Sequence, residues 1–165
     1  MILAYLDASA LAKRYVPETG SPAVEHLFRR VPTSQLAVLS VGLAEVMSIL
    51  VRKRNLGRLT AALFRQAVSD ASAEVGTASP VRLVTVDGAL AQRAFHLIDQ
   101  YSINSTDAIL LRSALDLATP LRAAGDDLLL VASDKRLLTA ARAEGLTAFD
   151  PETRSAADLD TIIGP

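Results

Sequence analysis

The stretch ILAYLDAS, residues 2–9, decides how the rest of the chain is interpreted. Its hydrophobic start is typical of a short buried strand, and this strand stops abruptly at Asp7, after which small residues favour a helix. Aspartate is a favoured N-cap at the start of a helix. The carboxyl end of a strand is also where α/β proteins place their ligand sites. Both roles, helix cap and ligand site, are possible for Asp7. The residues that follow the other predicted strands are needed to distinguish them.

The same alternation of a short strand and a longer helix recurs along the chain. We expect strands at 2–6, 35–39, 82–86, 128–132 and 147–149, and helices at 8–15, 21–30, 41–54, 60–75, 87–100, 105–118 and 135–144. This order predicts an α/β fold with three α/β/α layers, in which a short, mostly parallel central sheet of about five strands is flanked by helices. Residues that directly follow strands would then meet at one edge of the sheet.

Length and composition fit one domain that is held together by an aliphatic core. The chain has 165 residues, half of them hydrophobic, and we expect one domain at 1–150 and a tail at 151–165 that packs on it or flanks it. The formal net charge is -1. A protein that holds nucleic acid by charge alone would usually be more basic, so such a partner would need a local patch or a bound cation.

The residue inventory excludes several classes of site and of location. Without cysteine, the chain has no disulfides and no thiolate metal sites. The apolar start is too short, and too soon interrupted by charged residues, for a signal peptide or a membrane span. We therefore expect a soluble cytoplasmic protein with no membrane partner.

Asp134 repeats the arrangement of Asp7, because it follows an apolar strand and a serine and precedes a helix. In a parallel sheet both strands end at the same edge, so Asp7 and Asp134 can point into one crevice. We expect Ser133 to cap the helix, which would free Asp134 to face that crevice. Asp87 has the same local pattern, and periodicity alone does not separate it from the other two.

Asp107 lies in the first turn of a predicted helix, with its side chain on the buried face. At about 100° per residue it shares this face with Leu111 and Ala114. The helix dipole favours an acidic residue here by only about 0.3–1 kcal/mol, and an exposed position would serve equally well. Burying an unpaired carboxylate costs several times more. An inward-facing Asp107 therefore needs a basic side chain or a cation as its partner.

Glu45 is the weakest candidate on pattern alone. It lies nearly opposite the apolar stripe of its helix, beside Ser48 and Arg52, as an ordinary solvated glutamate would. Its position in the early turns of a helix that follows a strand would still let the side chain lean over the sheet edge. Elsewhere, the sequence has no H-E-x-x-H motif and no glycine-rich phosphate loop.

Four of these segments, taken in order, resemble the motifs of the PIN-domain ribonucleases, and most closely the VapC-type toxins of toxin–antitoxin pairs. The matching stretches are YLDASALAKRYVPETGS (5–21), SVGLAEVMSIL (40–50), STDAILLRSAL (105–115) and LVASDKRLLTAARAEGL (130–146). The resemblance implies a metal-dependent endoribonuclease with a PIN-like fold, whose acidic residues are Asp7, Glu45, Asp107 and Asp134. It raises Glu45 to a good candidate and reduces Asp87 to a helix cap. The stretch between residues 75 and 105 matches the pattern least.

Carboxylates that converge in one crevice repel each other, by about 4 kcal/mol per pair at ~4 Å and an effective dielectric constant near 20. A divalent cation removes this repulsion, and oxygen ligands favour Mg²⁺ or Mn²⁺ over zinc. We expect Asp7 and Asp107 to bind the principal ion directly. Asp134 and Glu45 would bind through water or hold a second ion roughly 3.5–4 Å away.

Further contacts can be expected around these carboxylates. Ser9 and Ser133 are expected to orient the carboxylates or water, with helix capping as the alternative. Several basic residues follow the acidic motifs and either contact RNA phosphates or are merely solvated: Lys13, Arg14, Arg52, Lys53, Arg54, Lys135 and Arg136. The resemblance also implies a homodimer and a small cognate antitoxin that enters the acidic cleft.

Two other classes of function remain as alternatives. One is an aspartate-based phosphotransfer domain, although a receiver domain needs an acidic pair before its nucleophile and a haloacid-dehalogenase-type phosphatase needs D-x-D, where this chain has Ser9. The other is a catalytically degenerate PIN fold that binds RNA or protein. Inward-facing carboxylates would be costly to keep without a use, which favours the enzyme over the binding module.

Overall fold

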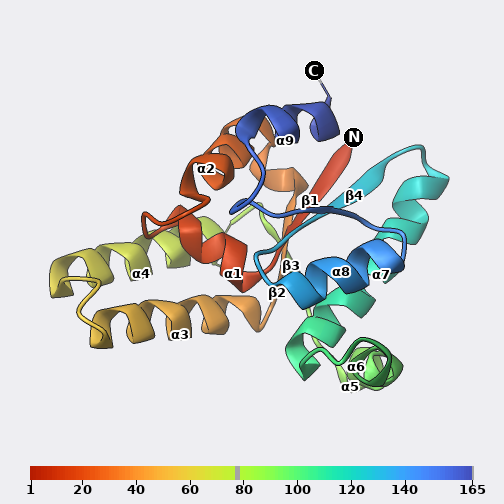
Figure 1. Ribbon diagram of the computed structural model, residues 1–165, viewed down its shortest axis with the longest axis horizontal. Helices are drawn as coiled ribbons and strands as arrows, with labels where there is room; N and C mark the ends of the chain where they lie inside the picture. Colours follow the sequence, from red (N-terminus) through yellow and green to blue (C-terminus); the bar gives the residue numbers. More distant parts are fainter. Residues whose placement is uncertain (77–78, 165) are drawn as a thin grey trace.

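The computed structural model describes residues 1–76 and 79–164. Its strands are β1 (Ile2–Leu6), β2 (Leu36–Leu39), β3 (Arg82–Val84), β4 (Asp127–Val131) and β5 (Thr147–Phe149). Its helices are α1 (Ala8–Leu11), α2 (Ser21–Arg30), α3 (Gly42–Asn55), α4 (Ala61–Val75), α5 (Gly88–Arg93), α6 (Phe95–Tyr101), α7 (Ser105–Ala123), α8 (Lys135–Ala143) and α9 (Ala156–Ile163), with 3₁₀ turns η1 (Ala12–Arg14) and η2 (Thr33–Gln35). Figure 1 shows their arrangement.

The strands form one five-stranded sheet in the order β3-β2-β1-β4-β5, and every pairing between them is parallel. The central strand β1 ends in register with both of its neighbours, since Leu6 is paired with Val38 and with Val131. The carboxyl ends of the central strands therefore lie side by side, as the sequence predicted. The residues that follow β1 and β4 leave the sheet at the same edge.

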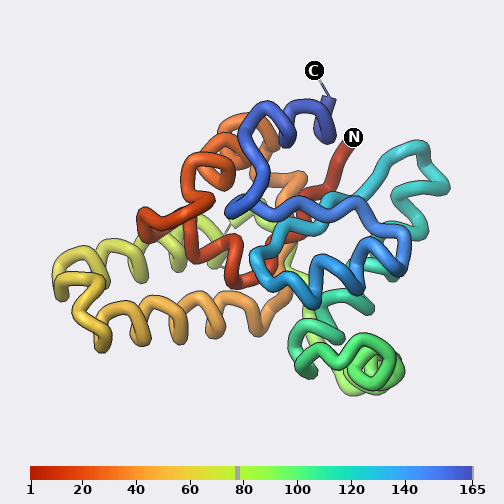
Figure 2. Tube along the Cα trace, viewed as in Figure 1, coloured from red at the N-terminus to blue at the C-terminus, as the bar shows by residue number. Residues whose placement is uncertain are grey.

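Helices cover both faces of the sheet, so the predicted three-layer α/β/α class is confirmed. One apolar core joins the alternate strand residues Leu6, Val38 and Val131 to helices α1–α4 and to α9. The other core joins Tyr5 and the opposite strand residues to α6, α7 and α8. Helices α3 and α4 pack against each other and extend away from the sheet as a long hairpin (Figures 1 and 2).

The structure and the predicted segments differ at several points. The helix expected at 87–100 is divided into α5 and α6 at Ala94, a fully buried residue where the chain turns. The tail expected at 151–165 contains helix α9, which packs on α2, while residue 165 itself lies outside the described residues. No helix in the described ranges is both long and apolar enough to span a membrane.

Candidate active site

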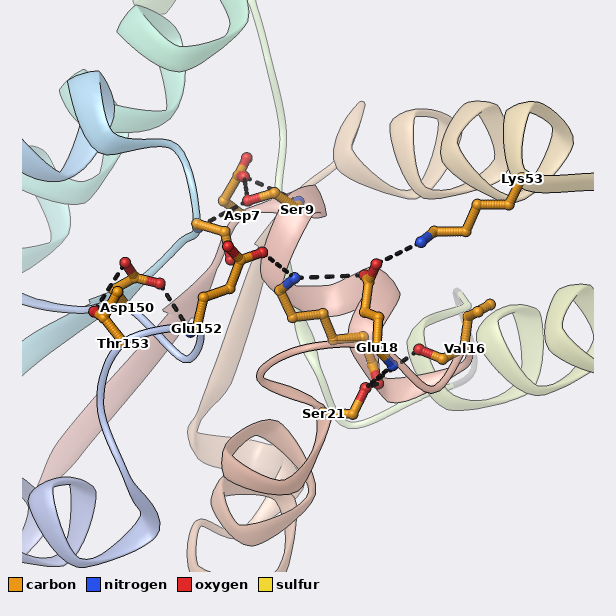
Figure 3. Close-up of polar contacts among 11 residues, drawn as sticks. Asp7, Ser9, Val16, Glu18, Ser21, Lys53, Asp150, Glu152 and Thr153 are labelled. Atoms are coloured by element: carbon orange, nitrogen blue, oxygen red, sulfur yellow. Dashed lines mark hydrogen bonds and ion pairs between the residues drawn. The ribbon is translucent and has the colours of Figure 1, made fainter. Parts of the chain in front are cut away.

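Asp7 stands directly after the central strand, where the backbone fixes its position. Its amide donates to the carbonyl of Val131 at 2.9 Å, which extends the pairing of β1 and β4 by one residue. Its Oδ2 accepts hydrogen bonds from the Ser9 amide, at 3.0 Å, and from the Ser9 hydroxyl (Figure 3). Asp7 is thus the N-cap of α1, and it is buried, with 7% of its surface exposed. Capping uses only Oδ2, so both roles foreseen for Asp7 are compatible with the structure.

Ser9 links the loop after β1 to the loop after β4. While its hydroxyl donates to Asp7, it accepts the backbone N–H of Ser133 at 3.0 Å. The Ser133 hydroxyl is itself buried and has no hydrogen-bond partner in the described part of the chain. Ser9 therefore lies where the sequence analysis expected an orienting residue, whereas Ser133 reaches this network through its backbone.

Asp134 caps helix α8 through one of its two carboxylate oxygens. Oδ1 accepts from the amides of Arg136, at 2.8 Å, and Leu137, at 3.0 Å. The expectation that Ser133 would provide this cap is wrong, because Asp134 itself stands at the N-cap position. The side chain is exposed, and its second oxygen makes no hydrogen bond within the described ranges.

Asp107 lies in the first turn of α7, where Asn104 holds it from two sides. The Asn104 Oδ1 accepts from the Asp107 amide at 2.9 Å, and the Asn104 Nδ2 donates to Asp107 Oδ2 at 2.7 Å. Asp107 is only partly buried, because the first turn of α7 faces a hollow at the sheet edge and not the core beneath Leu111. The predicted inward direction is therefore correct only in part.

The electrostatics of Asp107 show that the acidic residues share one environment. Burial, followed by the negative charges of Asp7, Asp134 and Glu45, raises the pKa of Asp107 to about 7. Burial and the charge of Asp7 also raise the pKa of Glu45. Such shifts arise when carboxylates lie close together without a compensating positive charge.

Glu45 projects from the first turn of α3 into the same hollow. Ser48 and Arg52, which the sequence pattern placed beside it, line this hollow as well. The polar face of α3 therefore borders a shared hollow at this end of the helix and not open solvent. The sequence pattern therefore placed Glu45 correctly on the polar face of its helix, but it did not show that this face borders the hollow. Asp87, in contrast, caps α5 through its bond from the Leu90 amide at 2.7 Å.

The hollow has a volume of about 560 Å³ and lies at the carboxyl edge of the sheet. Its lining residues come from four separate segments: Asp7, Ala8, Ser9, Glu45, Ser48, Ile49, Arg52, Asn104, Asp107 and Asp134. In the described chain, no three acidic or histidine side chains are already arranged to hold one ion. Mg²⁺ usually keeps several of its waters in proteins, and a hollow of this size has room for a hydrated ion. The donor set of carboxylate oxygens fits Mg²⁺ or Mn²⁺.

Three of the seven basic residues that follow the acidic motifs in sequence are already in ion pairs. Lys13 is 4% exposed and donates to Glu152 at 2.6 Å and to Glu18 at 3.4 Å. Lys53 also pairs with Glu18 (Figure 3). Arg14 pairs with Glu74, again away from the hollow. These pairs exclude Lys13, Arg14 and Lys53 as free phosphate contacts. Of the basic residues, Arg52 alone lines the hollow within the described ranges.

Several solved structures, one of them a toxin, share this fold. VapC20 from Mycobacterium tuberculosis, a Sarcin-Ricin loop cleaving toxin, matches with a TM-score of 0.59 and 19% identity over 92% of this chain and 99% of that one. FitAcB from Neisseria gonorrhoeae matches with a TM-score of 0.61 and 13% identity, over 93% and 100%. A toxin–antitoxin complex from Klebsiella pneumoniae matches with a TM-score of 0.54 and 17% identity, over 90% and 97%.

These likenesses confirm, at the level of the fold, the predicted resemblance to VapC-type toxins. Each covers nine-tenths or more of both chains. No family model matches the sequence, and no curated protein matches it. The function of the chain is therefore inferred from the residues that line its own hollow.

Proposed function

We propose that this chain is an endoribonuclease that depends on Mg²⁺ or Mn²⁺ and acts as the toxin of a toxin–antitoxin pair. One observation carries the proposal: Asp7, Glu45, Asp107 and Asp134 come from distant parts of the sequence and line a single hollow. This hollow lies at the carboxyl edge of a parallel sheet, where α/β enzymes place their sites. A fold-sharing protein, VapC20, is a toxin that cleaves the Sarcin-Ricin loop.

The four carboxylates have different roles in binding the cation. Asp7 and Asp107 bind the principal ion directly, and each is held by a neighbour, Ser9 in one case and Asn104 in the other. Asp134 and Glu45 bind through water or hold a second ion. Asp134 keeps one oxygen for this role, because its cap uses only Oδ1.

A bound divalent ion would lower the pKa of a water that attacks the scissile phosphate and would offset the charge that develops there. The chain's own residues prepare the site for this chemistry. Ser9 fixes the direction of the Asp7 carboxylate, and Asn104 fixes that of Asp107. Because Asp107 has a pKa of about 7 without a cation, binding of a cation must displace its proton near neutral pH.

The partners follow from the same proposal. As a toxin, the protein would work in the cytoplasm on RNA, form a homodimer and be neutralised by a small antitoxin. The toxin–antitoxin complex from Klebsiella pneumoniae contains a chain of this fold, which supports an antitoxin partner.

The test is RNA cleavage by the purified protein with Mg²⁺, with Mn²⁺ and with EDTA. We expect cleavage with either ion and none with EDTA. Asp7→Asn and Asp107→Asn should lose cleavage and remain folded by circular dichroism. Asp99→Asn is the matched control, because Asp99 is exposed on α6 away from the hollow. Equal rates for Asp7→Asn and the wild type would refute the assignment.

Two measurements separate the proposal from the alternatives. Calorimetric titration with Mn²⁺ should show binding that Asp107→Asn weakens, and no binding at all would favour a degenerate binding module. A phosphoenzyme trapped on Asp7 would favour the phosphotransfer domain instead.

A further inference from the structure

A second hollow adjoins the acidic one along helix α3. It has a volume of about 420 Å³ and is lined by Met47, Ser48, Val51, Arg52, Asn55 and Leu56. Ser48 and Arg52 line both hollows, so the two are neighbours that share these side chains. The second hollow is mostly aliphatic, and Leu56 at its far end is 63% exposed. Its volume lies in the range of about 300–1,000 Å³ that is typical of pockets for small ligands.

Arg52 lies between the two hollows, and its guanidinium is not paired with any described acidic residue. Its side chain forms no ion pair or hydrogen bond with any described residue, whereas the neighbouring Lys53 pairs with Glu18 and Arg54 contacts Asn55 and the ring of Phe64. A free guanidinium beside an acidic hollow is suited to an anion, and its planar group fits a phosphate well.

Along α3, an acidic residue, a basic residue and aliphatic residues follow one another, which suits the scissile phosphate, the neighbouring phosphate and the base of a single RNA strand. Glu45 and Arg52 are seven residues apart, about 10 Å along the helix axis. A strand whose scissile phosphate lies at the carboxylates could place a neighbouring phosphate at Arg52 and the attached base over Val51 and Leu56. Single-stranded RNA is commonly bound with its bases unstacked against protein side chains.

We propose that Arg52 and the aliphatic hollow beyond it form a subsite for the nucleotide next to the cut, in which Arg52 binds the phosphate and the side chains of Val51 and Leu56 hold the base. This inference rests on the proposed function. The alternative occupant is a protein segment that inserts a basic side chain into the acidic hollow. The positive charge of Arg52 opposes such a segment and attracts a polyanion.

The first test measures RNA cleavage kinetics of Arg52→Ala beside Arg65→Ala, a matched control on the exposed face of α4. We expect Arg52→Ala to raise KM about tenfold with kcat nearly unchanged, because one charge-assisted contact is lost outside the reacting centre. Arg52→Lys should recover part of the loss. The dependence of log KM on log salt should become shallower by about 0.7, which corresponds to one phosphate contact on a single strand.

The second test identifies the contacts on the RNA. One uncharged methylphosphonate at a time replaces the phosphates beside the cut, and we expect one position at which the wild type is impaired and Arg52→Ala is not impaired further. An abasic nucleotide at that position should likewise remove the effect of Leu56→Ser. Leu63→Ser is the control, because Leu63 is similarly exposed, at 58%, on α4.

The outcomes separate this inference from the proposed function. If the wild type does not cleave RNA, the proposed function fails and the subsite fails with it. If the wild type cleaves RNA but Arg52→Ala and Leu56→Ser behave like their controls, only the subsite is refuted.

Discussion

Asp107 is the residue on which the charges of the site act most strongly. Its pKa rises from 3.8 to about 7 because of burial and then because of the charges of Asp7, Asp134 and Glu45. Without a cation, the folded protein therefore keeps a proton at Asp107 near neutral pH, where an unfolded chain would have lost it. A cation has to compete with this proton, so its affinity should increase as the pH rises through 7.

The raised pKa of Asp107 predicts a pH-dependent stability for the protein in EDTA. The folded state holds this proton more tightly than the unfolded state, so the stabilisation is fully present below about pH 4 and is lost as the pH rises through about 7. Asp107→Asn removes this titration. Because Asp107 is partly exposed, solvent screening reduces the effect. We expect the Tm of Asp107→Asn, relative to wild type, to rise by about 2–4 °C between pH 5 and pH 8, which is about 1 kcal/mol.

Thermal melts across this pH range, with Asp99→Asn as the control, check the Asp107 prediction. The control should follow the wild type at every pH, because Asp99 is exposed and away from the hollow. A constant difference between Asp107→Asn and the wild type from pH 5 to pH 8 would contradict the electrostatic account of Asp107.

Ser9 supports both the Asp7 carboxylate and the loop after β4, so its removal should affect stability and metal binding together. Ser9→Ala removes the hydroxyl that donates to Asp7 and leaves the Ser133 amide without its acceptor. We expect a loss of about 1–2 kcal/mol in the free energy of unfolding, measured with urea, and weaker Mn²⁺ binding by calorimetry. Ser9→Thr keeps the hydroxyl and should restore most of both. Unchanged Mn²⁺ affinity in Ser9→Ala would refute the orienting role.

Local sequence signals were sufficient for some of these residues and not for others. Asp7 and Asp134 follow apolar strands, so the topology of a parallel sheet brings them to one edge. Glu45 has no such signal, and only the resemblance selected it. The ion pair of Lys13 with Glu152 could not be predicted, because the two residues are 139 positions apart and no local pattern links them.

At the level of the elements, most segments follow from hydrophobic periodicity, and the differences concern where they end. Helix α7 was expected to stop at residue 118, before Pro120, but it continues to Ala123. A proline removes one hydrogen bond, which a helix tolerates more easily near its end than at its centre. Helix α9 was missed although Ser155 and Asp158 form a capping box, a signal that was present in the sequence.

The N-terminus of α7 couples helix capping to the candidate site. Asn104→Ala removes the cap of α7, which should cost about 1 kcal/mol of stability, and also removes the amide that donates to Asp107. Thr60→Ala is a matched control, because Thr60 caps α4 in the same way and does not line the hollow. We expect similar losses in urea unfolding for both variants, and weaker Mn²⁺ binding for Asn104→Ala alone. Equal Mn²⁺ affinities would show that Asn104 acts only as a cap.

On the scale of the whole molecule, the C-terminal segment packs against the N-terminal segments that follow the central strand β1. In the segment after β5, Glu152 accepts a hydrogen bond from the buried Lys13. The segment continues into α9, which packs on α2 (Figure 1). Leu159 of α9 is fully buried in the core that also contains Leu6 and Leu27. Residues 151–164 are therefore part of the packed structure, a long-range relation that periodicity within each segment does not reveal.

If α9 is part of this core, then Leu159→Ala should destabilise the entire fold. Truncating a buried leucine usually costs about 2–5 kcal/mol, because apolar contact is lost and a cavity remains. We expect a loss of about 3 kcal/mol in urea unfolding, with one cooperative transition for α9 and the sheet together. Thr161→Ala, on the exposed face of the same helix, should change stability by no more than about 0.5 kcal/mol. A helix that merely flanks the domain would instead give a small effect for both variants, or a separate early transition while the sheet stays folded.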